Sequence, residues 1–165
     1  MAGSDLFERA QDYAHQKGLV IAERLGFGVH GSVFSAKDQT KGGRVAIKVH
    51  ERGRAYRQER DIYLRLQEHG VTEIRGCNVP ELIAFDDESW IIEMTMVKKP
   101  FVLDFAGAYL DEPPDFPEEV WADWHEEKQE QFGPRWAEVK AILDCLEDFG
   151  VFMSDVNPGN ISFDA

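Results

Sequence analysis

The chain has 165 residues, with 18 basic and 31 acidic side chains and a formal net charge of −13. A surface this negative repels phosphate backbones and anionic lipids, which argues against nucleic acid and membrane partners. Hydrophobic residues make up 43% of the sequence, enough for the core of one domain or two small lobes. The two cysteines lack metal-ligand spacing, and neither a signal-peptide pattern nor a membrane-length apolar run occurs, so we expect a soluble cytoplasmic protein.

The first third of the chain predicts one helix followed by strands. The helix covers residues 4–17, because Ser4 and Asp5 can cap its start and Gly18 can end it. Short alternating runs broken by glycines come next, which is typical of strands. Three strands are predicted in this region, at residues 20–22, 32–36 and 45–49.

The middle of the chain predicts a second helix and a hairpin. Residues 54–69 return to helical spacing and end at Gly70. Two apolar runs, 83–85 and 90–94, flank an acidic turn and form the predicted hairpin. A lobe boundary follows, near residues 94–100.

The last third predicts two more helices, over residues 115–131 and 134–149, and then a turn-rich tail. The pattern as a whole is that of an α+β protein in three parts. These are an N-terminal helix (residues 1–18), a sheet-rich lobe with one helix (19–98) and a reduced helical lobe (99–165).

Three glycines, Gly26, Gly28 and Gly31, form a GxGxxG pattern. Such a pattern also occurs in ordinary hairpin turns, and its context decides between the two. In a dinucleotide-binding unit a helix would follow the third glycine, whereas here the alternating residues 32–36 predict a strand. A glycine loop between two strands forms a flap whose backbone amides can lie over phosphates.

Lys48 closes the apolar strand that starts at Val45, and a partly buried ammonium needs a counter-charge or water. The next helix offers a carboxylate at Glu59, about one turn before the apolar residue Ile62. We therefore expect Glu59 to hold the Lys48 ammonium toward a phosphate cleft. The alternative is that Glu59 is a solvated carboxylate on the helix surface.

In this order the motifs resemble the ATP-binding lobe of the protein-kinase family. The resemblance has three parts. The glycine-rich loop comprises Gly26, Gly28, Gly31 and Val33, the lysine strand is residues 45–48, and the helix glutamate is Glu59. Only 11 positions separate Lys48 from Glu59 (59 − 48), fewer than is typical of kinases, so the connecting segment is shortened.

The resemblance implies ATP as the ligand and Lys48 as a catalytic residue that contacts its phosphates. It also implies that Ile92 lines the back of the pocket and that the backbone from Glu93 to Thr95 meets the adenine. The residues implied to bind the nucleotide are Gly26, Gly28, Gly31, Val33, Ala46, Lys48, Glu59, Ile92, Glu93 and Thr95.

Near the end of the chain, Asp155 and Asn160 keep the spacing of the kinase catalytic loop. By that resemblance Asp155 orients or deprotonates an attacking hydroxyl, and Asp155 and Asn160 together hold Mg²⁺. The alternative is a tight turn over residues 157–160 that Asp155 caps.

The chain also departs from the family pattern. Met153 and Ser154 stand where kinases have His-Arg, Asn157 stands in the place of a lysine, and no Asp-Phe-Gly follows Asn160. We therefore expect an α+β, protein-kinase-like fold whose helical lobe is reduced and lacks the activation segment. Its function would be that of a minimal Mg²⁺-dependent phosphotransferase of unknown substrate.

Two other functions remain open. One is a catalytically inactive, pseudokinase-like protein that binds nucleotide. The other is a scaffold whose reduced helical lobe meets a protein partner or a second copy of the chain. In that case Phe116, Trp121 and Trp124 would mark the interface.

Overall fold

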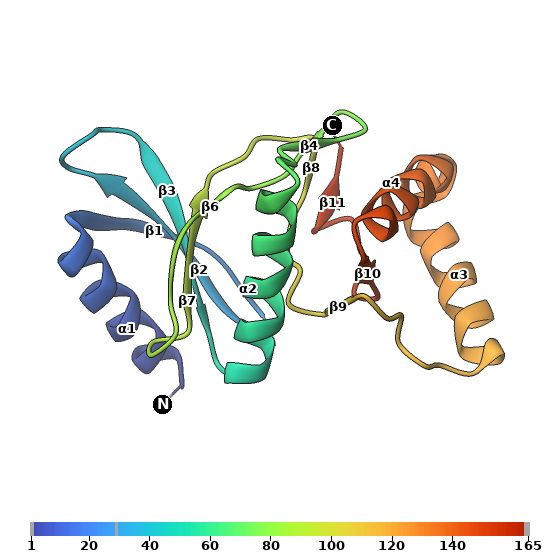
Figure 1. Cartoon of the computed structure of the whole chain (residues 1–165), viewed down its shortest axis with the longest axis horizontal. Coiled ribbons are helices and arrows are strands. Elements are labelled where there is room, and N and C mark those ends of the chain that lie inside the picture. Colours follow the sequence, from blue (N-terminus) through green and yellow to red (C-terminus); the bar gives the residue numbers. More distant parts are fainter. Residues whose placement is uncertain (1, 29, 164–165) are drawn as a thin grey trace.

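The structure is a computed structural model that describes residues 2–28 and 30–163. It is an α+β fold built on a five-stranded antiparallel sheet (Figure 1). In sheet order the strands are β1 (Leu19–Gly28), β2 (Gly31–Asp38), β3 (Arg44–His50), β7 (Ile91–Thr95) and β6 (Leu82–Asp86). The helices are α1 (Ala2–Lys17), α2 (Gly53–Glu68), α3 (Glu118–Phe132) and α4 (Trp136–Asp148), with a 3₁₀ turn, η1 (Gly133–Arg135), before α4.

Two smaller sheets connect the large sheet to the C-terminal helices. One has the order β11 (Ile161–Ser162), β8 (Phe101–Val102), β5 (Cys77–Asn78) and β4 (Glu73–Ile74). The other pairs β10 (Val151–Met153) with β9 (Ala108–Leu110). Helices α3 and α4 lie at the opposite end of the molecule from α1 (Figure 1).

Side chains of β3 alternate between two faces of the large sheet, as strand geometry requires. Ile47 and Val49 are fully buried in a cluster with residues of α1. Ala46 belongs to the other cluster, which contains Tyr56 of α2. Lys48 lies between Ile47 and Val49 in the sequence, so its side chain is directed to the face that α2 covers.

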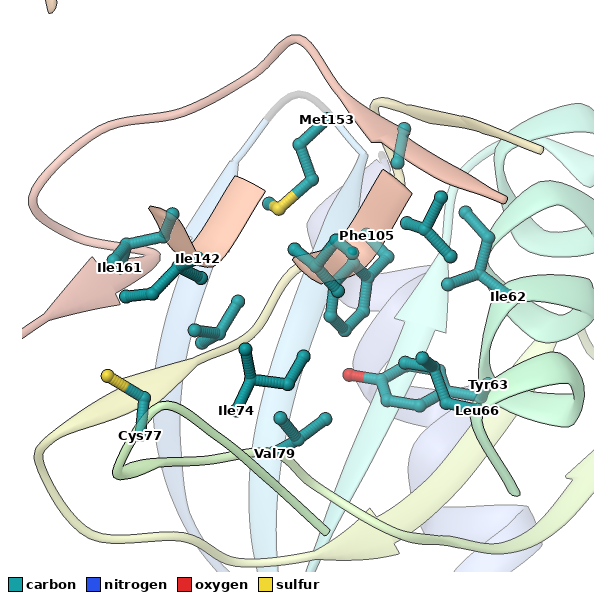
Figure 2. Close-up of a cluster of buried hydrophobic side chains, with 14 of the residues drawn as sticks. Ile62, Tyr63, Leu66, Ile74, Cys77, Val79, Phe105, Ile142, Met153 and Ile161 are labelled. Atoms are coloured by element: carbon teal, nitrogen blue, oxygen red, sulfur yellow. The ribbon is translucent and has the colours of Figure 1, made fainter. Parts of the chain in front are cut away.

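A larger hydrophobic cluster joins the sheet-rich part to the C-terminal part. Figure 2 shows Leu66 of α2, Phe105, Ile142 of α4, Met153 and Ile161 converging in it. Burying each large aliphatic side chain contributes about 1.5–3 kcal/mol. The segments that carry the predicted site residues are therefore fixed to one another by a shared core.

The predicted helices and longer strands are present, with bounds that differ by at most about three residues except in β1, which continues beyond the predicted residue 22 through Gly26 to Gly28. The short strands β4, β5, β8 and β9 were not predicted. Each has two or three residues, and the partners of β8 and β9 lie far along the chain. Such short pairings depend on tertiary contacts rather than on local periodicity.

No helix in the described part of the chain is both long enough and apolar enough to cross a lipid bilayer.

Candidate functional site

The glycine pattern lies at the tight end of the β1–β2 hairpin, where Gly28 pairs with Gly31. Val29, between them, is outside the described residues. Gly31 has a φ of 146° and pairs with His50 of β3, and a Cβ atom there would collide with the carbonyl oxygen of Val49. Gly31 therefore permits the hairpin to lie close to β3.

Gly26 stands in a different environment. A Cβ atom added at Gly26 would find no atom of the described residues within 4 Å. Neither packing nor a positive φ explains a glycine there. The position can take a small side chain without strain in the free protein.

The expected ion pair between Lys48 and Glu59 is present. Lys48 Nζ lies 2.8 Å from Glu59 Oε1, and the two residues are 6% and 0% exposed. A carboxylate this deeply buried is stable only when it is paired. Glu59 is thus an interior partner of Lys48 and not a solvated surface group.

A second carboxylate, that of Asp104, holds the same ammonium. Its Oδ1 atom accepts a hydrogen bond from Lys48 Nζ at 2.9 Å. Asp104 follows β8 and has a positive φ of 69°, a conformation that non-glycine residues adopt only rarely and often at functional sites. The next residue, Phe105, donates its backbone N–H to Glu59 Oε2 at 2.8 Å.

His50 completes what we call the charge cluster, which consists of Lys48, His50, Glu59 and Asp104. The His50 ring is fully buried, with Nε2 at 2.7 Å from Glu59 Oε1 and Nδ1 at 3.1 Å from the Trp90 carbonyl oxygen. Both neighbours are hydrogen-bond acceptors, whereas a neutral imidazole can donate only one hydrogen bond. His50 therefore links Glu59, through its ring, to Trp90, the residue before β7.

The cluster shifts the pKa values of its members. Burial disfavours the charged form of Glu59, but Lys48 and His50 more than offset it and lower the Glu59 pKa to about 2. Burial also opposes the charge on Lys48, and the two carboxylates outweigh it and raise the Lys48 pKa. Lys48 and Glu59 are accordingly both charged at neutral pH.

The loop that carries Asp155 and Asn160 is closed by the Asn160 side chain. Asn160 Nδ2 donates to the Asp155 carbonyl oxygen at 2.6 Å, and Asn160 Oδ1 accepts the Asn157 N–H at 2.9 Å. Asn160 is 3% exposed, whereas the Asp155 side chain is exposed. Asn160 thus shapes the loop, and its amide oxygen keeps one lone pair for a further partner.

Backbone pairing places this loop beside Asp104. Ile161 of β11 pairs with Val102 of β8, and the Leu103 N–H donates to the Asn160 carbonyl oxygen at 2.9 Å. A Cβ atom added at Gly107 would lie 2.9 Å from the Cβ atom of Asp155. Residues 103–107 therefore contact the Asp155 loop at both ends, through Leu103 and Gly107, and the charge cluster between them, through Asp104 and Phe105.

The predicted nucleotide-lining residues divide between the two sheet faces. Ala46 and Ile92, together with the half-buried Val33, pack in the cluster on the α2 face. Glu93 points to the opposite face, where its Oε1 atom accepts a hydrogen bond from Tyr13 of α1 at 2.8 Å.

The backbone expected to meet adenine lies within the large sheet. Strand β7 pairs with β3 on one side and with β6 on the other. At its end the Thr95 N–H donates to the Glu81 carbonyl oxygen, and Thr95 Oγ1 accepts the Glu81 N–H, both at 2.9 Å. Glu93 thus packs against α1 instead of lining a pocket, and the chain leaves the sheet only after Thr95.

A metal would find oxygen ligands but no complete cage. Within residues 2–28 and 30–163, no group of three or more His, Cys, Asp or Glu side chains is placed to hold a metal ion. The available oxygens belong to Asp104, whose side chain is 35% exposed, to Asp155 and to the Asn160 amide. A hard cation such as Mg²⁺, which keeps several of its waters and binds one or two carboxylates, fits such a set.

Sequence reasoning missed two members of the charge cluster, Asp104 and His50. His50 is two residues after Lys48 and so lies on the same face of β3, a signal that was available. Asp104 had no signal of this kind, because the kinase resemblance places the second carboxylate after Asn160.

The sequence matches no known family model, and no curated protein is similar enough to count as a relative. The site is therefore defined by its geometry: a buried lysine, held by two carboxylates, beside a glycine hairpin and an exposed aspartate.

Proposed function

We propose that the protein binds ATP in a protein-kinase-like manner and transfers its terminal phosphoryl group. The observation that carries the proposal is the Lys48 ammonium, which Glu59 and Asp104 hold at 2.8 and 2.9 Å on the α2 face of the sheet. In kinases a lysine paired with a helix glutamate positions the ATP phosphates, and the Lys48–Glu59 pair supplies that arrangement here, with Asp104 as a second carboxylate.

In the proposed complex the β1–β2 hairpin covers the phosphates with its backbone amides. The absence of a side chain at Gly26 leaves room for the nucleotide, and Lys48 contacts the phosphate oxygens. Val33, Ala46 and Ile92, on the same face of the sheet, contribute apolar surface to the pocket.

Asp104 takes the role that kinases give to the aspartate of Asp-Phe-Gly, which binds the metal. In kinases that motif follows the catalytic loop, whereas Asp104 and Phe105 precede Asp155 here. The pairing of β8 with β11 nevertheless brings Asp104 next to the Asn160 loop. When Mg²⁺ is bound, it would neutralise the developing phosphate charge, with Asp104, Asn160 and Asp155 as the candidate ligands.

Asp155 supplies the base. Its exposed carboxylate accepts the proton of the acceptor hydroxyl, while that oxygen bonds to the terminal phosphorus and the bond to the ADP oxygen breaks. Lys48 compensates the negative charge that collects on the phosphate oxygens. The acceptor becomes a phosphate ester, and ADP leaves.

A second candidate function is nucleotide binding without turnover. It is favoured by Asn157, which stands in the place of the lysine that kinases use to neutralise the transferred phosphate, and by the loop-closing hydrogen bonds of Asn160. In this case the charge cluster binds ATP as a ligand, and Asp155 has no proton to accept.

The test combines binding and turnover. Thermal shift with ATP, with and without Mg²⁺, is measured for the wild type, Lys48→Met and Gly26→Ala, with Lys37→Met as the control, since Lys37 is an exposed lysine of β2. We expect ATP to raise the melting temperature of the wild type and the control but not of Lys48→Met. We expect Gly26→Ala to keep the fold and to lose the response to ATP. This second variant keeps the test decisive if Lys48→Met does not fold.

Turnover is followed as release of phosphate or as self-labelling from γ-labelled ATP. We expect Asp155→Asn to lose the activity while keeping the ATP-induced shift. Binding without turnover in the wild type would select the second candidate, and equal ATP responses in the wild type and both site variants would contradict nucleotide binding at this site.

A further inference from the structure

A cavity of about 370 Å³ opens beside the charge cluster and has a basic wall. It lies between the end of the glycine hairpin, the start of α2 and the segment after Phe105. The lining residues are His30, Arg52, Arg54, Ala55, Gln58, Ala106, Gly107 and Tyr109.

The cavity and the charge cluster share two structural elements. On α2, Gln58 lines the cavity and its neighbour Glu59 binds Lys48. On the other segment, Ala106 and Gly107 directly follow Phe105, whose N–H binds Glu59. A ligand in the cavity would therefore lie next to the proposed phosphoryl-transfer site and in contact with the elements that form it.

Among the described residues, the side chains of the two arginines in the cavity wall, Arg52 and Arg54, have no carboxylate partner. Several other arginines bind carboxylates, as Arg60 does with Asp87 and Arg65 with Asp111. In the described part of the chain, the side chains of Arg52 and Arg54 make no hydrogen bond and no ion pair. In a chain with a net charge of −13, two arginines on one cavity wall without a carboxylate partner leave a local positive charge there.

The position of Arg52 and Arg54 on α2 adds to the positive potential of the cavity wall. Arg52 is the N-cap of α2 and Arg54 lies in its first turn, and α2, which is described throughout, has no acidic residue in that turn and no side-chain cap. A helix N-terminus carries a partial positive charge and is normally stabilised by acidic side chains. Arginines there raise the positive potential at the expense of helix stability, and a bound anion would reverse that cost.

We infer that this cavity binds a phosphate group, with Arg52 and Arg54 as its principal ligands and His30 at its rim. Arginine is the side chain best suited to grip phosphate oxygens in pairs. The volume lies in the range of small-molecule sites and holds a phosphate or pyrophosphate group with some water. The carboxylate of Asp155 lies close to Gly107, and its negative charge favours an anion at the arginine wall instead.

The phosphate can come from two sources, the tail of the nucleotide or a separate phosphorylated small molecule. The probe is pyrophosphate, and its binding is measured by calorimetry at low salt, first alone and then with saturating ATP. Displacement of pyrophosphate by ATP assigns the cavity to the nucleotide tail, whereas unchanged pyrophosphate binding assigns it to a second ligand. Both results require that pyrophosphate binds at the arginines.

The decisive variant is the double substitution Arg52→Gln with Arg54→Gln. We expect it to weaken pyrophosphate binding by about tenfold or more, the loss expected when charge-assisted hydrogen bonds are removed. The control is Arg44→Gln with Arg75→Gln, which removes the same charge from two exposed positions outside the cavity lining, and its binding should stay within about twofold of the wild type.

Absence of pyrophosphate binding to the wild type, or equal binding by the wild type and the cavity double variant, would overturn the inference. A protein that binds pyrophosphate but shows no ATP response would keep the inference and refute the proposed function. The two failures are therefore distinguishable in one set of measurements.

Discussion

Asp104 stands 56 residues after Lys48 in the chain, yet its Oδ1 atom accepts a hydrogen bond from the Lys48 ammonium at 2.9 Å. Its neighbour Phe105 donates its backbone N–H to Glu59 at 2.8 Å. The segment after β8 thus gives the cluster both a charge and a backbone donor. A ligand that competes with Lys48 for the Asp104 carboxylate would therefore contact this segment.

Asp104→Asn should remove the Mg²⁺ dependence of ATP binding while preserving the fold. An asparagine oxygen can still accept the Lys48 hydrogen bond, but it lacks the negative charge that a divalent cation requires. We expect ATP affinity in the presence of Mg²⁺ to fall by about tenfold or more, or roughly 1.4 kcal/mol. Calorimetric titration with and without Mg²⁺ measures it.

The matched control is Asp111→Asn, because Asp111 also has a positive φ and also binds a basic side chain, Arg65. Its ATP affinity should equal that of the wild type at each Mg²⁺ concentration. An Asp104→Asn protein that retains the full Mg²⁺ effect would exclude Asp104 as a metal ligand.

Gly26→Ala and Gly31→Ala should separate ligand binding from folding. A Cβ atom at Gly31 collides with the Val49 carbonyl oxygen, whereas one at Gly26 finds open space among the described residues. We expect Gly31→Ala to lower the melting temperature by several degrees, since about 1 kcal/mol corresponds to roughly 2–8 °C. Gly26→Ala should melt like the wild type and lose its response to ATP. A normal ATP response in Gly26→Ala would place the nucleotide elsewhere.

Acid should unfold the protein through Glu59. Its pKa is about 2 in the folded protein, against 4.5 for an unperturbed glutamate. The stabilisation is therefore complete above pH about 4.5 and is lost as the pH falls toward about 2, by roughly 3 kcal/mol in all. Denaturant unfolding at a series of pH values measures this slope.

In Glu59→Gln the part of the acid slope that Glu59 contributes should disappear, whereas Glu23→Gln, at an exposed position, should keep the full slope. Removing one member of a buried ion pair costs about 3–5 kcal/mol. If Glu59→Gln does not fold, the combination of Glu59→Gln with Lys48→Met removes both charges and serves instead. An undiminished acid slope in a folded Glu59 variant would show that other carboxylates cause it.

Gly107→Ala should impair turnover more than binding. The added methyl group would lie 2.9 Å from the Asp155 Cβ atom, closer than real contacts permit, so Asp155 must shift by several tenths of an ångström. Misplacement by about 1 Å costs around 100-fold in rate, so we expect roughly tenfold here. The ATP-induced thermal shift should stay unchanged, and an unaltered rate would show that Asp155 does not need this position.

Patterns along the chain were sufficient to predict the long elements and the Lys48–Glu59 pair. Helix α2 has a clear apolar face, and a lysine that closes an apolar strand calls for a nearby carboxylate. Asp104 instead follows β8, a strand of two residues that pairs with β5 and β11, which also have two residues each. Elements this short leave no periodicity in the sequence, so Asp104 could not be assigned to the cluster.

The Glu93 side chain lies on the face of the sheet opposite to Lys48 for a simple geometric reason. Ile92 pairs with Lys48 across the sheet, so the two side chains share a face. Adjacent residues of a strand point to opposite faces, and Glu93 must then face α1, where it accepts the Tyr13 hydrogen bond. The resemblance to kinases rests on the order of the motifs and does not specify the orientation of each side chain.

The order of the segments also has a consequence during synthesis. Lys48, Glu59 and Asp104 all leave the ribosome before Asp155 has been translated, and N-terminal parts of a chain tend to fold first. The ammonium and its two counter-ions can therefore assemble in the nascent polypeptide before β11 attaches the Asp155 loop. A growing chain built in this way would acquire the charge cluster first and the Asp155 carboxylate beside it later.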